Sequence, residues 1–229
     1  MNKVKKKNLE RLHYYLSRYM KIKKERPFVC DGSPYECEAF LVGINPAYSF
    51  ERSFWKYWDD DRGFNLKSWL EDFQKSRRRR EGKSSLTRTR YMIEKLREEL
   101  KDRQISLLDL NLYLKPTPRA NFLTASDKNT DVFRFLVNEI KPRLIYLHGN
   151  QPRMIFEENL GIKIEKNKFV YHDAFNLFAT NHLSYQISRE SMTEVAHKLA
   201  QHLKCATKRR RDISYAKPRF ENNKLLSKD

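Results

Sequence analysis

Short apolar runs alternate with amphipathic stretches along most of this chain, and this alternation limits the possible folds more than any other feature. The runs AFLVGI (39–44), ISLLDLN (105–111) and RLIYLHG (143–149) have the length of strands. A further run, KFVYHDAFNLFAT (168–180), predicts one bent strand or two short ones. Strands that alternate with helices are typical of parallel sheets covered by helices. We therefore predict an α/β fold, a three-layer α/β/α sandwich with a short, mostly parallel central sheet.

The segments between these runs carry apolar residues at helical spacing. We predict helices within 65–74, 84–100, 130–141, 151–161 and 188–204. The basic N-terminal segment predicts an amphipathic helix that packs on its own domain through Leu9, Leu12 and Leu16, rather than lying on a membrane. The run QKSRRRREGKSS (74–85) predicts a basic loop. The expected organisation is an N-terminal helix and lead-in over 1–37, an α/β domain over 38–206, and a basic flexible tail over 207–229.

The charge of the chain indicates a polyanionic partner. Lysine and arginine number 47 against 29 acidic residues, which gives a formal net charge of +18. Such a charge opposes compaction and favours binding to nucleic acid or to an anionic membrane surface. No apolar run approaches the length of a membrane span, and the N-terminus lacks the apolar core of a secretory signal. We expect a monomer that binds nucleic acid, DNA or RNA, rather than a membrane, located in the cytoplasm or nucleoid, or in the nucleus of a eukaryote.

Neither a metal nor a cofactor is expected. The three cysteines Cys30, Cys37 and Cys205 are odd in number and widely spaced, so we interpret them as free thiols in a reducing compartment. They complete no zinc or iron–sulfur pattern. The acidic run 59–61 is more typical of a solvated loop, or of partners for nearby arginines, than of a metal site. The chain also has no glycine-rich phosphate loop.

Polar residues follow the predicted strands at their carboxyl ends, where open α/β sheets bind their ligands. The first strand runs into Gly43-Ile44-Asn45-Pro46, the second ends on Asn111, and the last leads to Asn181-His182-Leu183-Ser184. Each feature alone has a simpler interpretation: a turn, a loop cap, or a histidine bonded to backbone. Together they predict two amides and a histidine on one rim of the sheet. His148 ends the third strand and is a further candidate for the lining of a pocket there.

These segments resemble the motifs of the uracil-DNA glycosylase superfamily. Its first motif is a strand ending in Gly-x-Asp/Asn-Pro, as at 43–46; its middle motif is an apolar strand ending in Asn, as in SLLDLNLYLKPTP (106–118); its last is His-Pro-Ser, here His-Leu-Ser at 182–184. The resemblance covers roughly residues 38–204 with the motif order intact. It is closest to the mismatch-specific/thymine-DNA and single-strand-selective monofunctional branches. Two departures are Ala47-Tyr48 after the first motif and Leu183 in the last.

The resemblance implies a role for each motif residue. Asn45 would hold the attacking water, and His182 would donate a hydrogen bond to the carbonyl oxygen of the leaving base. Asn111 would grip the edge of that base, and an aromatic residue would stack on it. The candidates are Tyr48, Phe50 and Phe54, of which Phe54 is favoured. An amide orients water but does not deprotonate it, so turnover slower than in relatives with aspartate is expected.

The resemblance also implies DNA contacts outside the base pocket. Gln186 or Ile187 would fill the gap left by the flipped base. Phosphate contacts and non-specific attraction would come from Ser184, Ser188, Arg189 and the run Arg77, Arg78, Arg79, Arg80. The predicted function is a monofunctional DNA glycosylase that removes uracil or a related damaged or modified base. The alternatives are a glycosylase for a non-uracil base, or an inactive DNA-binding protein with the same fold.

Overall fold

A six-stranded sheet forms the centre of the protein in the computed structural model, which describes residues 3–20, 25–48, 52–83, 85–172, 175–184 and 188–211. The sheet has the strand order β1-β5-β2-β6-β8-β7. Its strands are β1 (Phe28–Val29), β2 (Ala39–Gly43), β5 (Leu107–Asn111), β6 (Leu144–His148), β7 (Phe169–His172) and β8 (Phe175–Thr180). The four central strands are parallel to one another, and the edge strands β1 and β7 are antiparallel to their neighbours. The predicted α/β class and mostly parallel sheet are confirmed.

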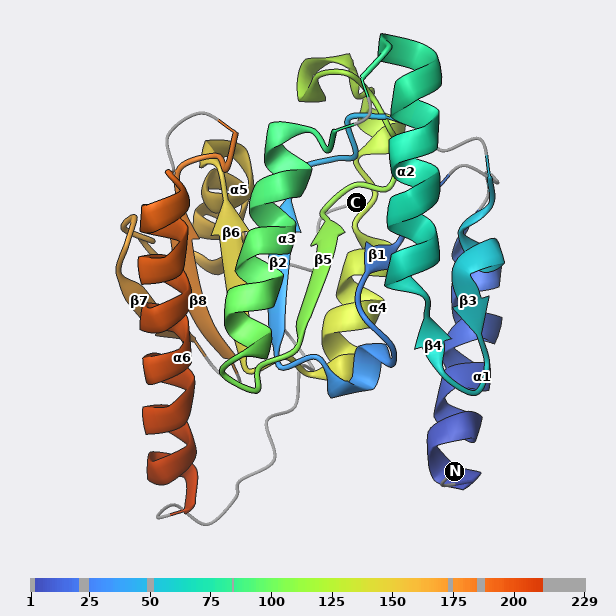
Figure 1. Ribbon diagram of the computed structural model, residues 1–229. Helices are drawn as coiled ribbons and strands as arrows, with labels where there is room; N and C mark the ends of the chain where they lie inside the picture. Colours follow the sequence, from blue (N-terminus) through green and yellow to red (C-terminus); the bar gives the residue numbers. More distant parts are fainter. Residues whose placement is uncertain are drawn as a thin grey trace.

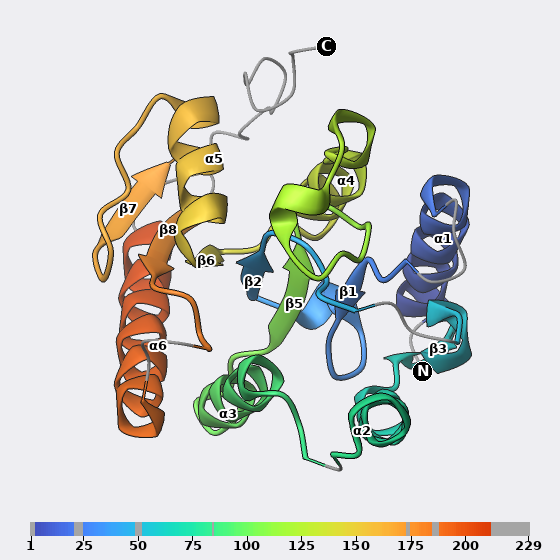
Figure 2. The ribbon, with the colours of Figure 1, turned by 90° about the horizontal axis from the view of Figure 1, so that it is seen from above.

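Helices flank this sheet on both faces (Figures 1 and 2). Helices α3 and α6 lie on one face and α4 and α5 on the other, while α1, α2 and a small hairpin of β3 and β4 lie beyond the β1 edge. The bounds are α1 (Lys3–Tyr19), α2 (Leu66–Glu81), α3 (Arg88–Lys101), α4 (Asp131–Ile140), α5 (Asn150–Leu160), α6 (Arg189–Arg211), β3 (Trp58–Asp59) and β4 (Gly63–Phe64). Short 3₁₀ turns are η1 (Pro34–Glu36), η2 (Phe54–Tyr57), η3 (Ala120–Phe122) and η4 (Ala125–Asp127). No helix in the described part of the chain is long and apolar enough to cross a membrane.

Alternation along the strands divides the core between the two faces. On β2, Ala39 and Leu41 pack with α3 and α6, whereas Phe40 and Val42 pack in the cluster that includes α4 and α5. The N-terminal helix joins the second cluster, since Leu12 and Leu16 are fully buried there. The predicted packing of α1 on its own domain is thus confirmed. Because β1 also pairs with β5, the lead-in and the α/β domain share one sheet and one core.

Helix α2 is longer than its apolar spacing predicts. The basic loop expected over 74–85 is wrong, because the helix continues through the arginine run to Glu81 and ends at Gly82 in the left-handed conformation. Arginine is a good helix former, and Arg77 turns inward to bond Glu81 and the carbonyl of Ser85, at 2.9 and 2.5 Å. A basic composition was therefore misleading where the local propensity was helical.

The other predicted elements are confirmed within a few residues. Segment 168–180 forms two antiparallel strands, β7 and β8, which settles the two alternatives left by its sequence. Helix α6 begins after Ser188, whose hydroxyl accepts from the Ser191 amide at 3.1 Å. It runs to Arg211, past the position where the tail was expected to begin, and residues 212–229 lie outside the described part of the chain.

The connections of the central strands leave their carboxyl edge in opposite directions. The chain leaves β2 toward α2 and α3, but leaves its neighbours β5 and β6 toward α4 and α5 on the other face. Loops that leave adjacent strands in opposite directions open a crevice, which is where doubly wound sheets bind ligands. Gly43 and Asn111, the last residues of β2 and β5, are paired there.

Candidate functional site

Four residues lie side by side where the central strands end: Asn111, Gly43, His148 and Thr180. Together with His182, which follows β8, they are called the polar row. Gly43 of β2 pairs with Asn111 of β5, and His148 of β6 pairs with Thr180 of β8. Gly43 joins the two pairs, because a Cβ atom built on it would lie 2.7 Å from Asn111 Oδ1 and 2.8 Å from His148 Nε2. The amide and the imidazole thus occupy the space that any larger residue at position 43 would fill. The absence of a side chain at Gly43 is what lets these two polar groups approach the backbone.

Asn45 follows β2 in a loop that is bonded to the segment after β5. The amides of Leu112 and Tyr113 donate to the carbonyls of Gly43 and Ile44, each at 3.0 Å. These bonds extend the strand pairing past the end of the sheet. They hold the loop that carries Asn45 against the segment that leads to Thr117.

The orientation of the Asn45 amide follows from its acceptors. Its Nδ2 donates to the Thr117 hydroxyl at 2.7 Å, to the Thr117 carbonyl at 3.0 Å and to the Pro46 carbonyl at 3.1 Å. The Thr117 hydroxyl gives its own proton to the Arg119 carbonyl at 2.8 Å, so it must accept from Asn45. Since three acceptors surround the nitrogen, Oδ1 is left as the group that can accept a hydrogen bond from a ligand or a water.

His182 lies in the loop after β8, next to the end of β6. Its Nδ1 accepts from the Ser184 amide at 3.2 Å and lies 2.7 Å from the Ser184 hydroxyl. Burial lowers the pKa of His182, which favours the neutral ring at physiological pH. A neutral ring that accepts at Nδ1 carries its proton on Nε2. His182 is therefore a neutral donor through Nε2.

His148 was noted from sequence only as a candidate pocket residue, and the structure places it at the centre of the row. Its ring centre lies 5.2 Å from that of His182, and the Cβ position of Gly149 would lie 3.3 Å from His182 Cδ2. Burial lowers the pKa of His148 to about 3, and protonation of the adjacent His182 would act in the same direction. Its Nδ1 is buried without a hydrogen-bond partner among the described residues. Its position between Gly43 and His182 could be found only from the tertiary structure, because a histidine at a strand end has no distinctive sequence pattern.

Of the three aromatic candidates, Phe50 lies outside the described residues, and the other two differ in their availability to a ligand. Tyr48 is 47% exposed, and Arg80 lies 4.6 Å above the centre of its ring. Phe54 is 3% exposed and packs against Phe28 and Phe64. Both line one pocket, described below, but the phenol of Tyr48 is the more accessible stacking surface.

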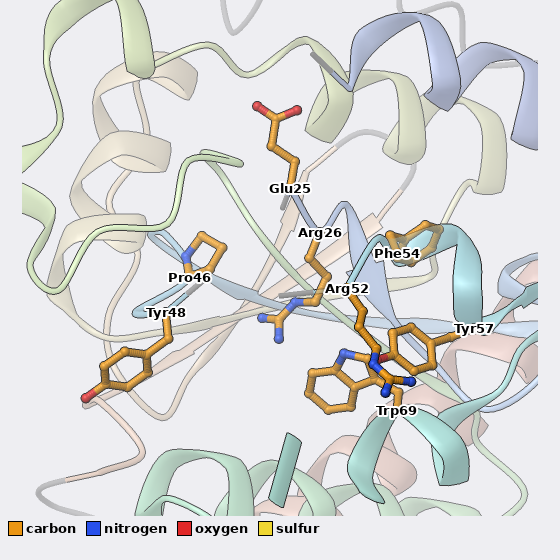
Figure 3. A pocket seen from close by; sticks show the side chains of 8 residues that line it. All are labelled: Glu25, Arg26, Pro46, Tyr48, Arg52, Phe54, Tyr57 and Trp69. Atoms are coloured by element: carbon orange, nitrogen blue, oxygen red, sulfur yellow. The ribbon is translucent and has the colours of Figure 1, made fainter. Parts of the chain in front are cut away.

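A small pocket, part of it open to solvent, lies beside the loop after β2 (Figure 3). Pro46 and Tyr48 of that loop line one part of it, and the Arg26 guanidinium points into its middle above Trp69. The rest of its wall comes from Glu25, Arg52, Phe54 and Tyr57. Asn111 and His182 are not among its lining residues. The loop after β2 thus separates two neighbouring regions, the polar row and this aromatic pocket.

The residues expected to contact DNA fall into three groups. Gln186 and Ile187 lie outside the described residues, as does the side chain of Arg189 at the start of α6. Ser184 contacts His182, and the Ser188 hydroxyl caps α6. On α2, Arg78, Arg79 and Arg80 are exposed, but Arg77 is buried and bonded to Glu81. The expectation that Arg77 adds to a basic surface is wrong, because the helical twist directs it inward.

The described residues contain no group of three or more His, Cys, Asp or Glu side chains that could hold a metal ion. In the acidic run, Asp59 accepts from the backbone amides of Asp61 and Arg62. Asp60 bonds His13 and Trp58, and Asp61 pairs with Lys6. The run is thus a turn in which the carboxylates of Asp60 and Asp61 bind the N-terminal helix. All three cysteines are free, as the sequence predicts.

An ion cluster lies directly beneath Asn111, and sequence reasoning missed it. Asp109, two residues earlier on β5 and therefore on the same face, accepts from Arg90 at 2.5 Å. Arg90 also bonds Glu94 at 3.0 Å, and Arg97 bonds Glu94 at 3.1 Å. A charged residue inside an otherwise apolar strand was the available signal. No protein-family model matches the chain, and no curated protein is significantly similar to it.

Proposed function

We propose that the protein is a monofunctional DNA glycosylase that hydrolyses the bond between deoxyribose and uracil, or a related damaged or modified base. The observation that carries the proposal is one edge of the parallel sheet, where Asn111 and His148 meet over the side-chain-free Gly43. His182 lies next to His148 there, and Asn45 follows two residues after Gly43. The sheet with helices on both faces is compatible with the three-layer α/β/α sandwich of the uracil-DNA glycosylase superfamily, which the motifs resemble.

The reaction needs three contributions from the protein: stabilisation of the leaving base, placement of the attacking water and selection of the base. As the glycosidic bond breaks, its electron pair goes to the base, and negative charge develops on a base carbonyl oxygen. His182 stabilises that charge by donating from Nε2, which the Nδ1 contacts with Ser184 leave protonated. Since the ring is neutral, it supplies a hydrogen bond rather than a full positive charge.

Asn45 places the water that attacks the sugar carbon. With Nδ2 held by Thr117 and Pro46, its Oδ1 accepts one hydrogen bond from that water and fixes its position. The amide cannot take the water's proton, which leaves to solvent or to the departing base. The water therefore attacks only after the glycosidic bond is largely broken. At that stage the sugar has cationic character, and a neutral water suffices as nucleophile.

Asn111 selects the base. An amide offers one donor and one acceptor, which match the O4 and N3–H edge of uracil when the amide is held in one orientation. Gly43 and His148 confine its Oδ1 and so restrict its rotation. Tyr48, with Arg80 on its ring, is the stacking surface nearest the loop after β2. Tyr48 is thus preferred over the buried Phe54 as the aromatic contact of the base.

The test uses single-stranded and duplex oligonucleotides that carry uracil or one of several modified bases, with alkaline cleavage of the abasic product as the readout. Asn45→Ala and His182→Ala are each expected to slow release by about 100-fold or more. Asn121→Ala and His197→Ala are matched controls, because both side chains are exposed and lie outside the site. Tight DNA binding with no release of any base would instead favour an inactive DNA-binding protein.

A further inference from the structure

Arg26 adds a further positive charge to the ion cluster beneath Asn111, which consists of Arg90, Arg97, Asp109 and Glu94. Arg90 and Arg97 are balanced by two carboxylates, Asp109 and Glu94, which bond them directly. Arg26 has no hydrogen bond or ion pair to a carboxylate within the described residues. Its electrostatic attraction to Asp109 and Glu94 acts over a longer distance. Burial and the charge of Arg90 lower the pKa of Arg26 to about 10, so the guanidinium stays charged at neutral pH. The cluster therefore keeps one uncompensated charge.

The guanidinium of Arg26 faces the aromatic pocket rather than the cluster's carboxylates. It lies 5.2 Å from the centre of the Trp69 ring, and Arg90 lies over the same ring at 4.7 Å. Figure 3 shows the group between Pro46 and Trp69, with the carboxylate of Glu25 directed away from it. One indole quadrupole contacting two guanidiniums offsets only part of their repulsion. The pocket thus presents unsatisfied donors to whatever enters it.

The rim of the pocket adds positive charge. Arg52 lies 3.2 Å from Asp72, but that carboxylate also pairs with Lys56 at 2.8 Å and with Lys75 at 3.9 Å. The single carboxylate of Asp72 therefore pairs with three cationic side chains. On the other side, Arg80 lies over the ring of Tyr48. Aromatic walls and cationic groups alternate around the opening, a combination that suits stacked bases and their phosphates.

We propose that this pocket binds the phosphate of a nucleotide, with the Arg26 guanidinium as the phosphate ligand. A guanidinium offers a planar fork of donors that matches two phosphate oxygens. The phosphate supplies the negative charge that the cluster lacks. The site is distinct from the polar row, since Asn111 and His182 do not line it, and its occupation needs no bond cleavage.

Calorimetric titration of the full chain compares thymidine 5′-monophosphate with thymidine at low ionic strength. The monophosphate is expected to bind at least about tenfold more tightly than the nucleoside, because charge-assisted hydrogen bonds to phosphate exist only for the former. Equal affinities for the two ligands, or no binding of either monophosphate or oligonucleotide, would overturn the proposal.

Arg26→Gln removes the charge while keeping a polar side chain of similar reach. It is expected to remove the advantage of the monophosphate over the nucleoside, and its melting temperature should not fall, because an uncompensated charge is lost. Arg26→Lys keeps a charge but not the fork, and should show a smaller loss. Arg103→Gln is the matched control, because Arg103 lies just past the C-terminal end of α3, whereas Arg90 lies at the start of that helix. Arg103 bonds Glu99. Wild-type affinity for the monophosphate in both Arg26 variants would contradict the assignment.

A third titration identifies the source of the phosphate. If the site serves free nucleotides, the monophosphate should bind and should not compete with a short single-stranded oligonucleotide. If it serves a DNA strand, the oligonucleotide should lose affinity in Arg26→Gln while the monophosphate binds weakly. Both results support a nucleotide-phosphate site. An oligonucleotide affinity that is unchanged in Arg26→Gln, with no monophosphate binding, would refute it. Because no base release is measured, an inactive glycosylase would leave this test intact.

Discussion

Gly43 determines how close the site residues come to one another. It sits between Asn111 and His148 on neighbouring strands, and both side chains reach over its Cα. Its backbone is an ordinary strand, so the requirement for glycine is one of space rather than conformation. A methyl group here would have to displace an amide or an imidazole, both of which are buried.

Gly43→Ala should therefore abolish most of the proposed activity. The added Cβ would lie within 3 Å of two polar atoms, and overpacking of this kind costs about 1–3 kcal/mol of folding free energy. Base release is expected to fall at least about 100-fold as Asn111 is displaced. Gly82→Ala is the control: its Cβ meets nothing within 4 Å, so it should lose some stability through its positive φ but keep activity. Undiminished base release in Gly43→Ala would contradict the assigned geometry.

His148 makes stability depend on pH in a defined direction. Its pKa is lowered to about 3 in the folded protein, against about 6.5 in the unfolded chain. The unfolded state therefore binds the extra proton first, and stability is retained above pH 6.5 and lost as the pH falls below it. His182 nearby shifts in the same direction.

Between pH 7.5 and pH 5, His148 should remove about 2 kcal/mol of unfolding free energy. The measurement is urea unfolding at both pH values for the wild type and for His148→Gln, which cannot titrate. The loss should be smaller in the variant by about that amount. An identical pH dependence in the two proteins would show that His148 titrates normally.

At the scale of elements, helix α3 is attached to the sheet by charges as well as by apolar packing. Arg90 and Arg97 reach from α3 to Asp109 in the middle of β5, where the carboxylate is 4% exposed. Arg97 also donates to the carbonyls of Leu107 and Val29, and so joins β5 to β1. This connection holds the strand whose last residue is Asn111.

Removing the Asp109 carboxylate should leave Glu94 as the single carboxylate that bonds the two buried arginines. Asp109→Asn is expected to cost about 3–5 kcal/mol, because breaking a buried pair leaves a buried charge. Asp31→Asn is the matched control: Asp31 pairs with Lys101 at an exposed site, where an ion pair is worth at most about 1 kcal/mol. Urea unfolding near pH 7.5 distinguishes the two. Equal costs would mean that the cluster contributes no more than a surface pair.

Periodicity predicted the main elements well but the edges poorly. The central strands β2, β5 and β6 are mostly apolar runs of strand length, so they could be located from sequence. Strands β1, β3 and β4 have two residues each and no periodicity to detect. The site divides similarly: Asn45, Asn111 and His182 could be predicted from strand ends and motifs, whereas the roles of His148 and Arg26 depend on neighbours that only the folded chain brings together.

For the whole molecule, a net charge of +18 should make DNA binding steeply dependent on salt. The logarithm of the binding constant should fall linearly with the logarithm of salt concentration, and each lost phosphate contact should reduce the slope by about 0.9 for duplex DNA and about 0.7 for single strands. The double variant Arg78→Gln/Arg79→Gln should reduce the slope. Arg77→Gln should lower stability and leave the slope unchanged, because its side chain is buried. The same slope in the double variant and the wild type would exclude α2 from the interface.

The most direct test of the account is the single-turnover release of free uracil from a single-stranded oligonucleotide, quantified by chromatography. The wild type is compared with the double variant Asn45→Ala/His182→Ala, with both proteins verified as folded. We predict release by the wild type and a rate at least about 1000-fold lower in the double variant, because the positioned water and the donor to the leaving base are both lost. Release at the same rate by both proteins would contradict the assignment of this site.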